Sequence, residues 1–220
     1  MSPPTRPAAI IFDLDGTLVD TVTARIDAWD ATFAEYGIPV ARSALRPMIG
    51  MDGRRLASEV AAAAGPALDD DAAEAIDRRA GELFDERNVD PRPLPGAREA
   101  LRRLDAAGIT WAIATSSRAE QVAASVGALE LDSAPKIVDG SAVERAKPAP
   151  DLLLLAAQQL GREPSACWYV GDSTWDMRAA VAASMRAVAV LAGAAVETDA
   201  LEAAGADAVI GTLDDLELPA

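Results

Sequence analysis

Three acidic side chains lie within eleven residues near the start of the chain, in IIFDLDGTLVD (residues 10–20). The first two, Asp13 and Asp15, come directly after an apolar run that is typical of a buried strand. Two ionised carboxylates at this spacing repel each other by several kcal/mol at the intermediate dielectric of a protein site, unless a cation or a shared proton intervenes. The spacing therefore predicts a site that attracts positive charge.

A second acidic pair, Asp172 and Asp176, follows another apolar run in GDSTWD (171–176). The chain contains no histidine, which excludes Ser-His and Cys-His catalysis and the commoner zinc sites. Acid–base chemistry must therefore be carried out by Asp or Glu. The single cysteine, Cys167, lies in an apolar run and is expected to be a small core residue.

The elements that must position these acids alternate along the chain. Short apolar runs of β type lie at 8–14, 109–115, 136–139, 166–171, 186–191 and 207–210. Helical patterns lie between them at 96–108, 118–127, 150–161 and 173–184. This alternation predicts an α/β fold, a Rossmann-like core with a parallel sheet flanked by helices. Ligands of such sheets bind at the carboxyl ends of the strands, where Asp13, Thr115 and Asp172 fall.

One stretch, from Thr21 to about Asn88, breaks this alternation. Four apolar residues in it follow the spacing of one helix face, and that helix should end near Gly37: Val22, Ile26, Trp29 and Phe33. Residues 53–65 and 69–88 read as further helices, and three prolines at 88–96 return the chain to the sheet. We therefore predict a core formed by residues 1–18 and 92–220, with an inserted all-helical cap at 19–91.

Composition limits the possible partners and locations. Of the 220 residues, 50% are hydrophobic, as in a globular protein, and no apolar run approaches the roughly 18 residues of a membrane span. The N-terminal MSPPTRPAA lacks an apolar signal core, and a single cysteine fits a reducing compartment, so we expect a cytoplasmic protein. The net charge of -15 argues against nucleic acid and anionic membranes as partners.

Four short segments end at predicted strand tips: DLDGT, IATSS, AKPAPD and GDSTWD. In this order and at these spacings they resemble the motifs of the haloacid dehalogenase superfamily, over residues 8 to 216. The resemblance is to the phosphatase branch with a helical cap, the branch of phosphoglycolate phosphatases and β-phosphoglucomutases. It implies that Asp13 attacks phosphorus to form an aspartyl-phosphate, and that Asp15 acts first as general acid and then as general base.

The resemblance also implies a magnesium site. Mg²⁺ would be bound by the Asp13 carboxylate, the backbone carbonyl of Asp15 and Asp172, which are hard oxygen ligands of the kind it prefers. The Thr17 hydroxyl can fix the orientation of an aspartate. Asp176 is expected to bind the metal through water or to orient other groups, and the alternative is an acid favoured by the helix dipole.

Phosphate binding is implied for three further residues. Lys147 matches the lysine that holds the nucleophile and the phosphate, although the residue before it is Ala146 where Gly is usual. Thr115 matches the motif whose hydroxyl grips phosphate, and the backbone N–H of Ser116 is the expected second donor. For Ser117 and Ser173, helix N-caps are at least as good an interpretation.

Substrate selectivity is expected to come from the cap, because the core residues contact only the phosphoryl group of the substrate. The segment 46–56 resembles the cap loop that faces the active site. Arg54 of this segment is the first candidate to meet an anionic leaving group, followed by Arg46 of the same segment and by the more distant Arg25, while a solvated arginine is the alternative.

Three other functions compete with hydrolysis of a small phosphorylated metabolite. A dehalogenase needs no leaving-group proton, so Asp15 argues against it. A sugar-phosphate mutase remains an alternative, although Arg25 stands where such mutases carry a histidine. A catalytically silent binding protein is the third, disfavoured by the intact motifs. The metabolite itself and the oligomeric state are left open.

Overall fold

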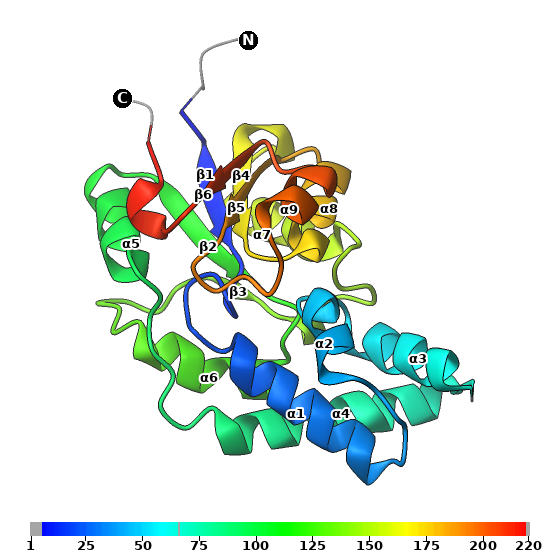
Figure 1. Cartoon of the computed structure of the whole chain (residues 1–220). Coiled ribbons are helices and arrows are strands. Elements are labelled where there is room, and N and C mark those ends of the chain that lie inside the picture. Colours follow the sequence, from blue (N-terminus) through cyan, green and yellow to red (C-terminus); the bar gives the residue numbers. More distant parts are fainter. Residues whose placement is uncertain (1–5, 66, 219–220) are drawn as a thin grey trace.

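The computed structural model describes residues 6–65 and 67–218, and its centre is a parallel sheet of six strands (Figure 1). The strand order is β3-β2-β1-β4-β5-β6. The strands are β1 (Ala9–Phe12), β2 (Thr110–Ala114), β3 (Ile137–Val138), β4 (Cys167–Gly171), β5 (Arg186–Val190) and β6 (Ala208–Ile210). Each lies inside one of the six predicted runs, so the predicted Rossmann-like fold is confirmed.

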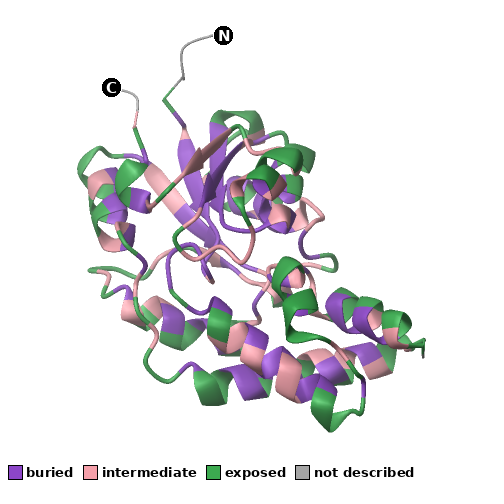
Figure 2. Ribbon diagram, viewed as in Figure 1, coloured by how far each residue is buried: buried purple, intermediate pink, exposed green. Residues whose placement is uncertain are grey.

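Strand β1 occupies the middle of the sheet, between β2 and β4. Ile11 lies opposite Ala112 on one side and Tyr169 on the other. Every residue of β1 and β4 is buried, and both strands are purple in Figure 2. Strands buried on both faces read as continuous apolar runs, which explains why these two were recognisable in the sequence. All strands are parallel, so their carboxyl ends meet at one edge of the sheet.

Helices cover both faces of the sheet. Side chains alternate across β1, so Ile11 packs on one face and Ile10 on the other. The Ile11 face is covered by α7 (Asp151–Leu160), α8 (Thr174–Ala182) and α9 (Thr198–Ala203). The Ile10 face is covered by α5 (Ala97–Ala106), α6 (Ala119–Ala128) and the short 3₁₀ helix η4 (Leu213–Asp215). Two further 3₁₀ turns of the sheet-bearing part are η2 (Gly140–Ala142) and η3 (Pro164–Ala166).

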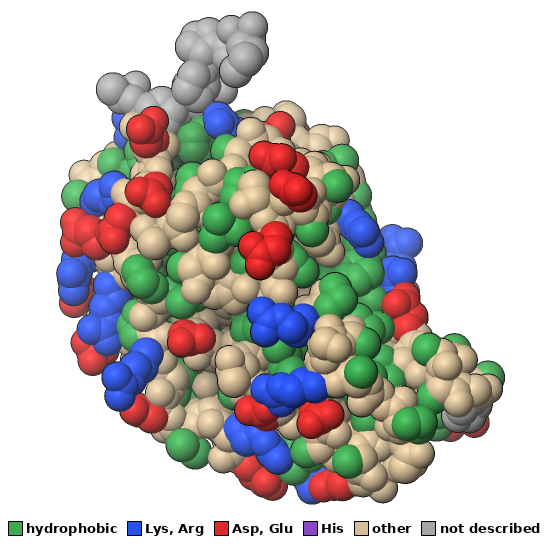
Figure 3. Space-filling view, in the orientation of Figure 1, with side chains coloured by type: hydrophobic (Ala, Val, Ile, Leu, Met, Phe, Trp, Pro, Cys, Tyr) green, Lys and Arg blue, Asp and Glu red, His purple; other side chains and the backbone are tan. Residues whose placement is uncertain are grey.

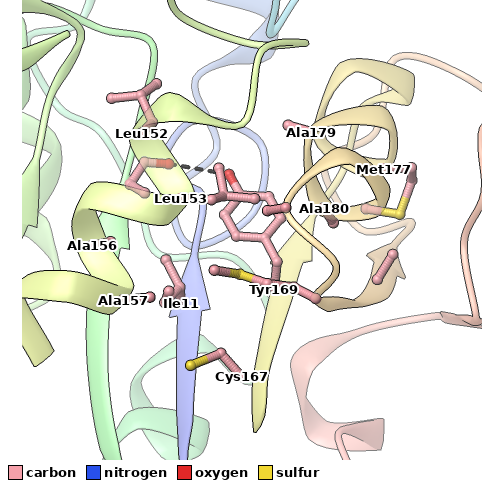
Figure 4. Packing of buried hydrophobic residues seen from close by; sticks show 14 of the residues in the cluster. Ile11, Leu152, Leu153, Ala156, Ala157, Cys167, Tyr169, Met177, Ala179 and Ala180 are labelled. Carbon is pink, nitrogen blue, oxygen red and sulfur yellow. Dashed lines mark hydrogen bonds between the residues drawn. The ribbon is translucent and has the colours of Figure 1, made fainter. Parts of the chain in front are cut away.

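Tyr169 of β4 lies at the centre of the core on the Ile11 face. Figure 4 shows its ring between helices α7 and α8, above Cys167 and beside Ile11. Its single hydroxyl proton has two acceptors within reach, the carbonyl oxygen of Ala114 at 3.1 Å and Asp176 Oδ1 at 3.0 Å. A buried hydroxyl needs such partners. Here they connect the apolar core to one of the predicted site residues.

Residues 19–91, called the cap below, contain helices and lie beside the sheet edge where the strands end (Figure 1). Its elements are α1 (Val22–Glu35), α2 (Arg42–Leu45), the 3₁₀ helix η1 (Arg46–Met48), α3 (Gly53–Ala64) and α4 (Asp70–Arg87). The predicted apolar face of α1 is buried in a cluster formed mainly by cap residues and joined by Trp175 of α8, and the ring centroids of Trp29 and Phe33 in it lie 5.5 Å apart. The short helices α2 and α9 were not predicted.

The two linkers between cap and sheet run side by side. Val19 forms a bridge with Pro93, the N–H of Asp20 donates to Arg92 O at 2.8 Å, and Leu94 N donates to Leu18 O at 2.9 Å. The predicted domain boundaries at 18/19 and 91/92 fall where these two linkers pair, and they remain predictions. Residues 1–5 and 219–220 of the predicted core lie outside the described part.

The surface carries both signs of charge. Figure 3 shows acidic and basic side chains interspersed on one face, despite the net charge of -15. Within residues 6–65 and 67–218, no helix has the length and apolar character needed to cross a bilayer.

Candidate active site

The strand tips and the cap enclose a small cavity of about 60 Å³, called the pocket below. Its core side is formed by eight residues from the ends of β1 and β2, the start of α6 and the loop before α7: Asp13, Asp15, Thr115, Ser116, Ser117, Arg118, Gln121 and Lys147. These segments are far apart in sequence, and the parallel sheet brings them to one edge. Asp172 and Asp176, which follow β4, do not line the pocket but lie beside Asp13, so the predicted acids are brought together at this edge.

Lys147 is completely buried between two carboxylates. Its Nζ lies 2.5 Å from Asp13 Oδ1 and 2.7 Å from Asp176 Oδ1. Burial alone would lower the pKa of Lys147, but the charges of Asp13 and Asp176 outweigh burial and raise it. The ammonium is thus held permanently charged beside the predicted nucleophile. A compact point charge fits this position, where a guanidinium fork would be too broad.

Replacing Lys147 by Met should destabilise the protein, because it leaves two buried carboxylates without their cation. Breaking a buried ion pair from one side costs about 3–5 kcal/mol. Urea unfolding without divalent metal should show a loss of this order. The matched control is Lys136→Met, since Lys136 is exposed and donates only to Gln159 O at 2.8 Å. Equal stability of the two variants would contradict a structural role for the Lys147 ion pairs.

Three buried carboxylates, from Asp13, Asp172 and Asp176, place oxygens within 4.8 Å of one another. Burial and then the neighbouring carboxylates raise the pKa of Asp172 well above its ordinary value. Burial likewise raises the pKa of Asp13 to about 7, against the opposing effect of Lys147. Because burial and mutual repulsion disfavour the ionised form of these carboxylates, a bound cation would stabilise their negative charges. All-oxygen donors suit a hard divalent ion, so the residues present fit such a metal.

Asp176 has both of its oxygens engaged by hydrogen-bond donors. Oδ1 accepts from Lys147 and Tyr169, and Oδ2 accepts from the hydroxyl of Ser173 at 2.5 Å and its N–H at 3.0 Å. Ser173 in turn caps α8, so the expected N-cap role of Ser173 is confirmed. These contacts suit Asp176 to orienting Lys147 more than to binding a metal directly.

Asp172 is oriented by the turn that follows β1. The Thr17 hydroxyl donates to Asp172 Oδ1 at 2.9 Å. Gly16, at φ +84°, approaches so closely that a Cβ there would lie 2.4 Å from Asp172 Oδ2. Only glycine allows this conformation and this approach. The DLDGT segment therefore supplies acids and also fixes the carboxylate of the GDSTWD segment.

Thr115 and Ser116 lie at the tip of β2, beside Lys147 in the pocket wall. Thr115 is buried, and its hydroxyl oxygen accepts from Ser117 N at 3.1 Å. The Ser116 hydroxyl donates to Gly50 O of the cap at 3.3 Å. Both residues thus line the pocket from the core side, as a phosphate-binding segment requires.

Asp15 lies in the pocket wall within a cluster of donors. Thr21 donates to Oδ1 at 2.7 Å, while Ser117 at 2.5 Å and Arg25 at 2.8 Å donate to Oδ2. Burial would raise the pKa of Asp15, but the Arg25 charge and these hydrogen bonds outweigh burial and lower it. The interpretation of Ser117 as the N-cap of α6 was wrong, because Arg118 occupies that position. The Ser117 hydroxyl instead donates a hydrogen bond to Asp15.

The cap forms the rest of the pocket wall. Ile49, Gly50 and Met51 of the predicted cap loop line it. Besides the Ser116 bond to Gly50 O, Trp175 Nε1 donates to Pro47 O at 2.8 Å and the N–H of Asp52 donates to Lys147 O at 2.9 Å, which holds the loop to the core. The segment 46–56 therefore faces the predicted catalytic residues.

The structure does not bring Arg54 into the pocket. Its guanidinium donates to Glu144 O at 2.9 Å and lies 3.5 Å from Asp52. It lines a separate groove of about 900 Å³ along the outer junction of cap and core. Arg46 is exposed at the start of η1. In this arrangement, Arg25 is the one of the three proposed arginines that reaches the pocket.

Three polar pocket residues were missed in the sequence: Asp77, Arg118 and Gln121. Arg118 pairs with Asp77 at 2.5 Å and with Glu74 at 2.9 Å, which joins the start of α6 to α4 of the cap. A charged residue on a helix surface gives no local signal of such a partner about forty residues away. The one sequence feature that could have indicated a basic partner is the acid pair Glu74 and Asp77, which lie one helical turn apart.

Residues 10–190 match the model of the haloacid dehalogenase-like hydrolase family. The chain is 32% identical over 210 residues to the N-acetylmuramic acid 6-phosphate phosphatase of Pseudomonas aeruginosa, covering 93% of this chain and 91% of that one. It is 31% identical over 198 residues to a phosphoglycolate phosphatase of Xanthomonas campestris, covering 85% and 84% respectively. The crystal structure of a hydrolase from Pseudomonas syringae superposes with a TM-score of 0.89, at 34% identity over 94% of each chain. The resemblance predicted from the four strand-tip segments is confirmed.

Proposed function

Because the chain belongs to the haloacid dehalogenase-like hydrolase family, we propose that it is a Mg²⁺-dependent phosphatase of small phosphomonoesters. One observation carries this proposal. The Asp13 carboxylate, at the C-terminal end of β1, lies 2.5 Å from the buried ammonium of Lys147. A carboxylate is a weak nucleophile, but phosphoryl transfer depends mainly on positioning and on charge neutralisation. Both are supported here by Lys147 and by Thr115 and Ser116 in the same wall.

The residues of the pocket account for both halves of the reaction. Asp13 forms a bond to phosphorus as the bond from phosphorus to the ester oxygen breaks. That oxygen takes a proton from Asp15, which must carry a proton at this point although Arg25 and the hydrogen bonds favour its ionised form. Asp15 then accepts a proton from water, whose oxygen attacks phosphorus and releases Asp13. Lys147 balances negative charge on Asp13 and on the phosphoryl oxygens throughout.

A divalent ion would be held by Asp13, Asp172 and the backbone carbonyl of Asp15. When bound, Mg²⁺ neutralises the phosphoryl oxygens and the crowded carboxylates. The raised pKa values of Asp13 and Asp172 support this assignment. The choice of Mg²⁺ among divalent ions rests on the all-oxygen donor set.

The size of the pocket bears on the substrate. A water molecule needs about 10–15 Å³ of such space, so about 60 Å³ holds a phosphoryl group and few further atoms. A larger leaving group would extend beyond this volume. Hydrolysis is preferred over mutase chemistry, because the curated relatives named above are phosphatases and Arg25 takes the place of the mutase histidine.

Metal binding is testable without turnover. Mg²⁺ should raise the midpoint of thermal unfolding of the wild type in proportion to ln(1 + [Mg²⁺]/Kd), since it binds only the folded state. Asp172→Asn should lose this stabilisation, whereas Asp132→Asn, at an exposed acid, should keep it. Phosphate release from p-nitrophenyl phosphate should vanish with EDTA and return with Mg²⁺. Undiminished release in EDTA would contradict the proposal.

A further inference from the structure

Arg25 is largely but not fully buried beside Asp15, although it lies in the cap and Asp15 belongs to the strand tip. The side chain of Arg25 is 13% exposed and that of Asp15 11%. The same Arg25 Nη2 donates to Asp15 Oδ2 and to the Ser117 hydroxyl, each at 2.8 Å. Ser117 donates onward to Asp15. These three side chains therefore form a closed triangle of hydrogen bonds.

The guanidinium of Arg25 is itself held in place. Its Cζ lies 3.4 Å from the centroid of the Phe84 ring, on α4. Its Nη1 lies 3.3 Å from Gln121 Oε1, on α6. A planar guanidinium can stack on an aromatic face and donate along its edge at the same time, which an ammonium cannot. The position thus uses properties that are specific to arginine.

The partners of Arg25 come from both parts of the molecule. Phe84 belongs to the cap, while Ser117 and Gln121 belong to the sheet-bearing core. The orientation of Asp15 is therefore defined only when cap and core are packed together. Thr21 adds a third donor to the carboxylate, from the residue that precedes α1. Three donors on two oxygens leave the side chain little rotational freedom.

From this geometry we propose that Arg25 is a positioning residue, which sets the Asp15 carboxylate for proton transfer and couples that setting to cap closure. The proposal rests on the proposed phosphatase function, in which Asp15 serves the leaving oxygen. Arg25 acts through Asp15 and not on the phosphoryl group, which lies with Asp13 and Lys147. Its removal should therefore slow the first step only for substrates that need a proton on the leaving group, and should slow the second step, in which Asp15 activates water, for every substrate.

The test compares two esters. Arg25→Met should lower kcat about 10²-fold on the alkyl phosphate that the wild type hydrolyses fastest among glycerol phosphate, phosphoglycolate and a hexose phosphate. On p-nitrophenyl phosphate, whose leaving group needs little protonation, the rate of the first step, measured as the initial release of p-nitrophenolate, should change less than about threefold. Any loss in kcat on this ester should come from the second step and be smaller than on the alkyl ester. Arg25→Lys should recover part of the alkyl activity. Arg42→Met, which breaks an exposed cap ion pair with Asp27, is the matched control and should leave both rates unchanged.

A double-mutant cycle separates positioning from general loosening of the cap. If Arg25 acts through Asp15, Asp15→Asn/Arg25→Met should be no slower on the alkyl ester than Asp15→Asn alone. Equal losses on both esters, additive losses in the double variant, or no loss at all would each overturn the proposal. Should Arg25→Met fail to fold, the Arg25→Lys variant carries the same comparison. A wild type that hydrolyses none of these esters refutes the proposed function itself, which is a different result.

Discussion

Asp13→Asn should reduce phosphate release on the order of 10⁴-fold or more, on every ester tested, because it removes the nucleophile of both half-reactions. The amide has nearly the same shape as the carboxylate, so the pocket should keep its form. The measurement is steady-state phosphate release with saturating Mg²⁺, for wild type and variant. The control is Asp20→Asn, at the third acid of the opening segment, which is exposed.

The fold of Asp13→Asn should remain intact. The change removes a partner of Lys147, but it also removes repulsion between Asp13 and the nearby carboxylates of Asp172 and Asp176. Circular dichroism and the unfolding midpoint in EDTA should therefore stay close to those of the wild type. A folded variant that retains wild-type turnover would eliminate Asp13 as the nucleophile.

Asp15→Asn should lower kcat on alkyl phosphates by about 10² to 10⁴, the usual contribution of general acid–base catalysis. On p-nitrophenyl phosphate the first step should be nearly unaffected, since the leaving group departs without a proton. The loss on that ester should appear in the second step, where Asp15 activates water, and should be smaller overall. The contrast is measured as the ratio of kcat values on the two esters.

Rapid mixing gives this prediction a sharper form. With p-nitrophenyl phosphate, Asp15→Asn should release a burst of p-nitrophenolate followed by slow turnover, as phosphorylated enzyme accumulates. The wild type should show a smaller burst or none. An equal loss on both esters, without a burst, would remove Asp15 from both proton-transfer roles.

The sheet and the strand tips were predictable because their signals are local. Runs such as 166–171 are apolar throughout, which parallel strands buried on both faces require. Asp13, Thr115 and Asp172 follow such runs directly, so the fold class alone predicted that they converge. The short helices α2 and α9 were missed because four and six residues give too few turns for a helical period.

The contacts between cap and core were not predictable in the same way. Ser117 has the residue type and the sequence position expected of a helix N-cap. Its hydroxyl donates to Asp15 only because the fold brings Asp15 close to it. Arg25 and Arg54 look alike in the sequence, as two arginines in a helical insertion. Packing directs one to the pocket and the other to a carbonyl at the rim. Such distinctions arise from tertiary neighbours far away in sequence.

The paired linkers have a consequence for how such a protein diverges. The cap leaves the sheet at Asp20 and returns at Arg92, and the two residues are joined by a hydrogen bond of 2.8 Å. In its topology the insertion is therefore a long loop whose two ends are adjacent. A protein tolerates the insertion of another segment at such a site. Exchange of this segment between related chains would transplant selectivity, while Asp13, Lys147 and Asp172 stay on the scaffold. Arg25 and Asp15 would be separated by such a graft, so a transplanted cap must bring its own partner for the acid.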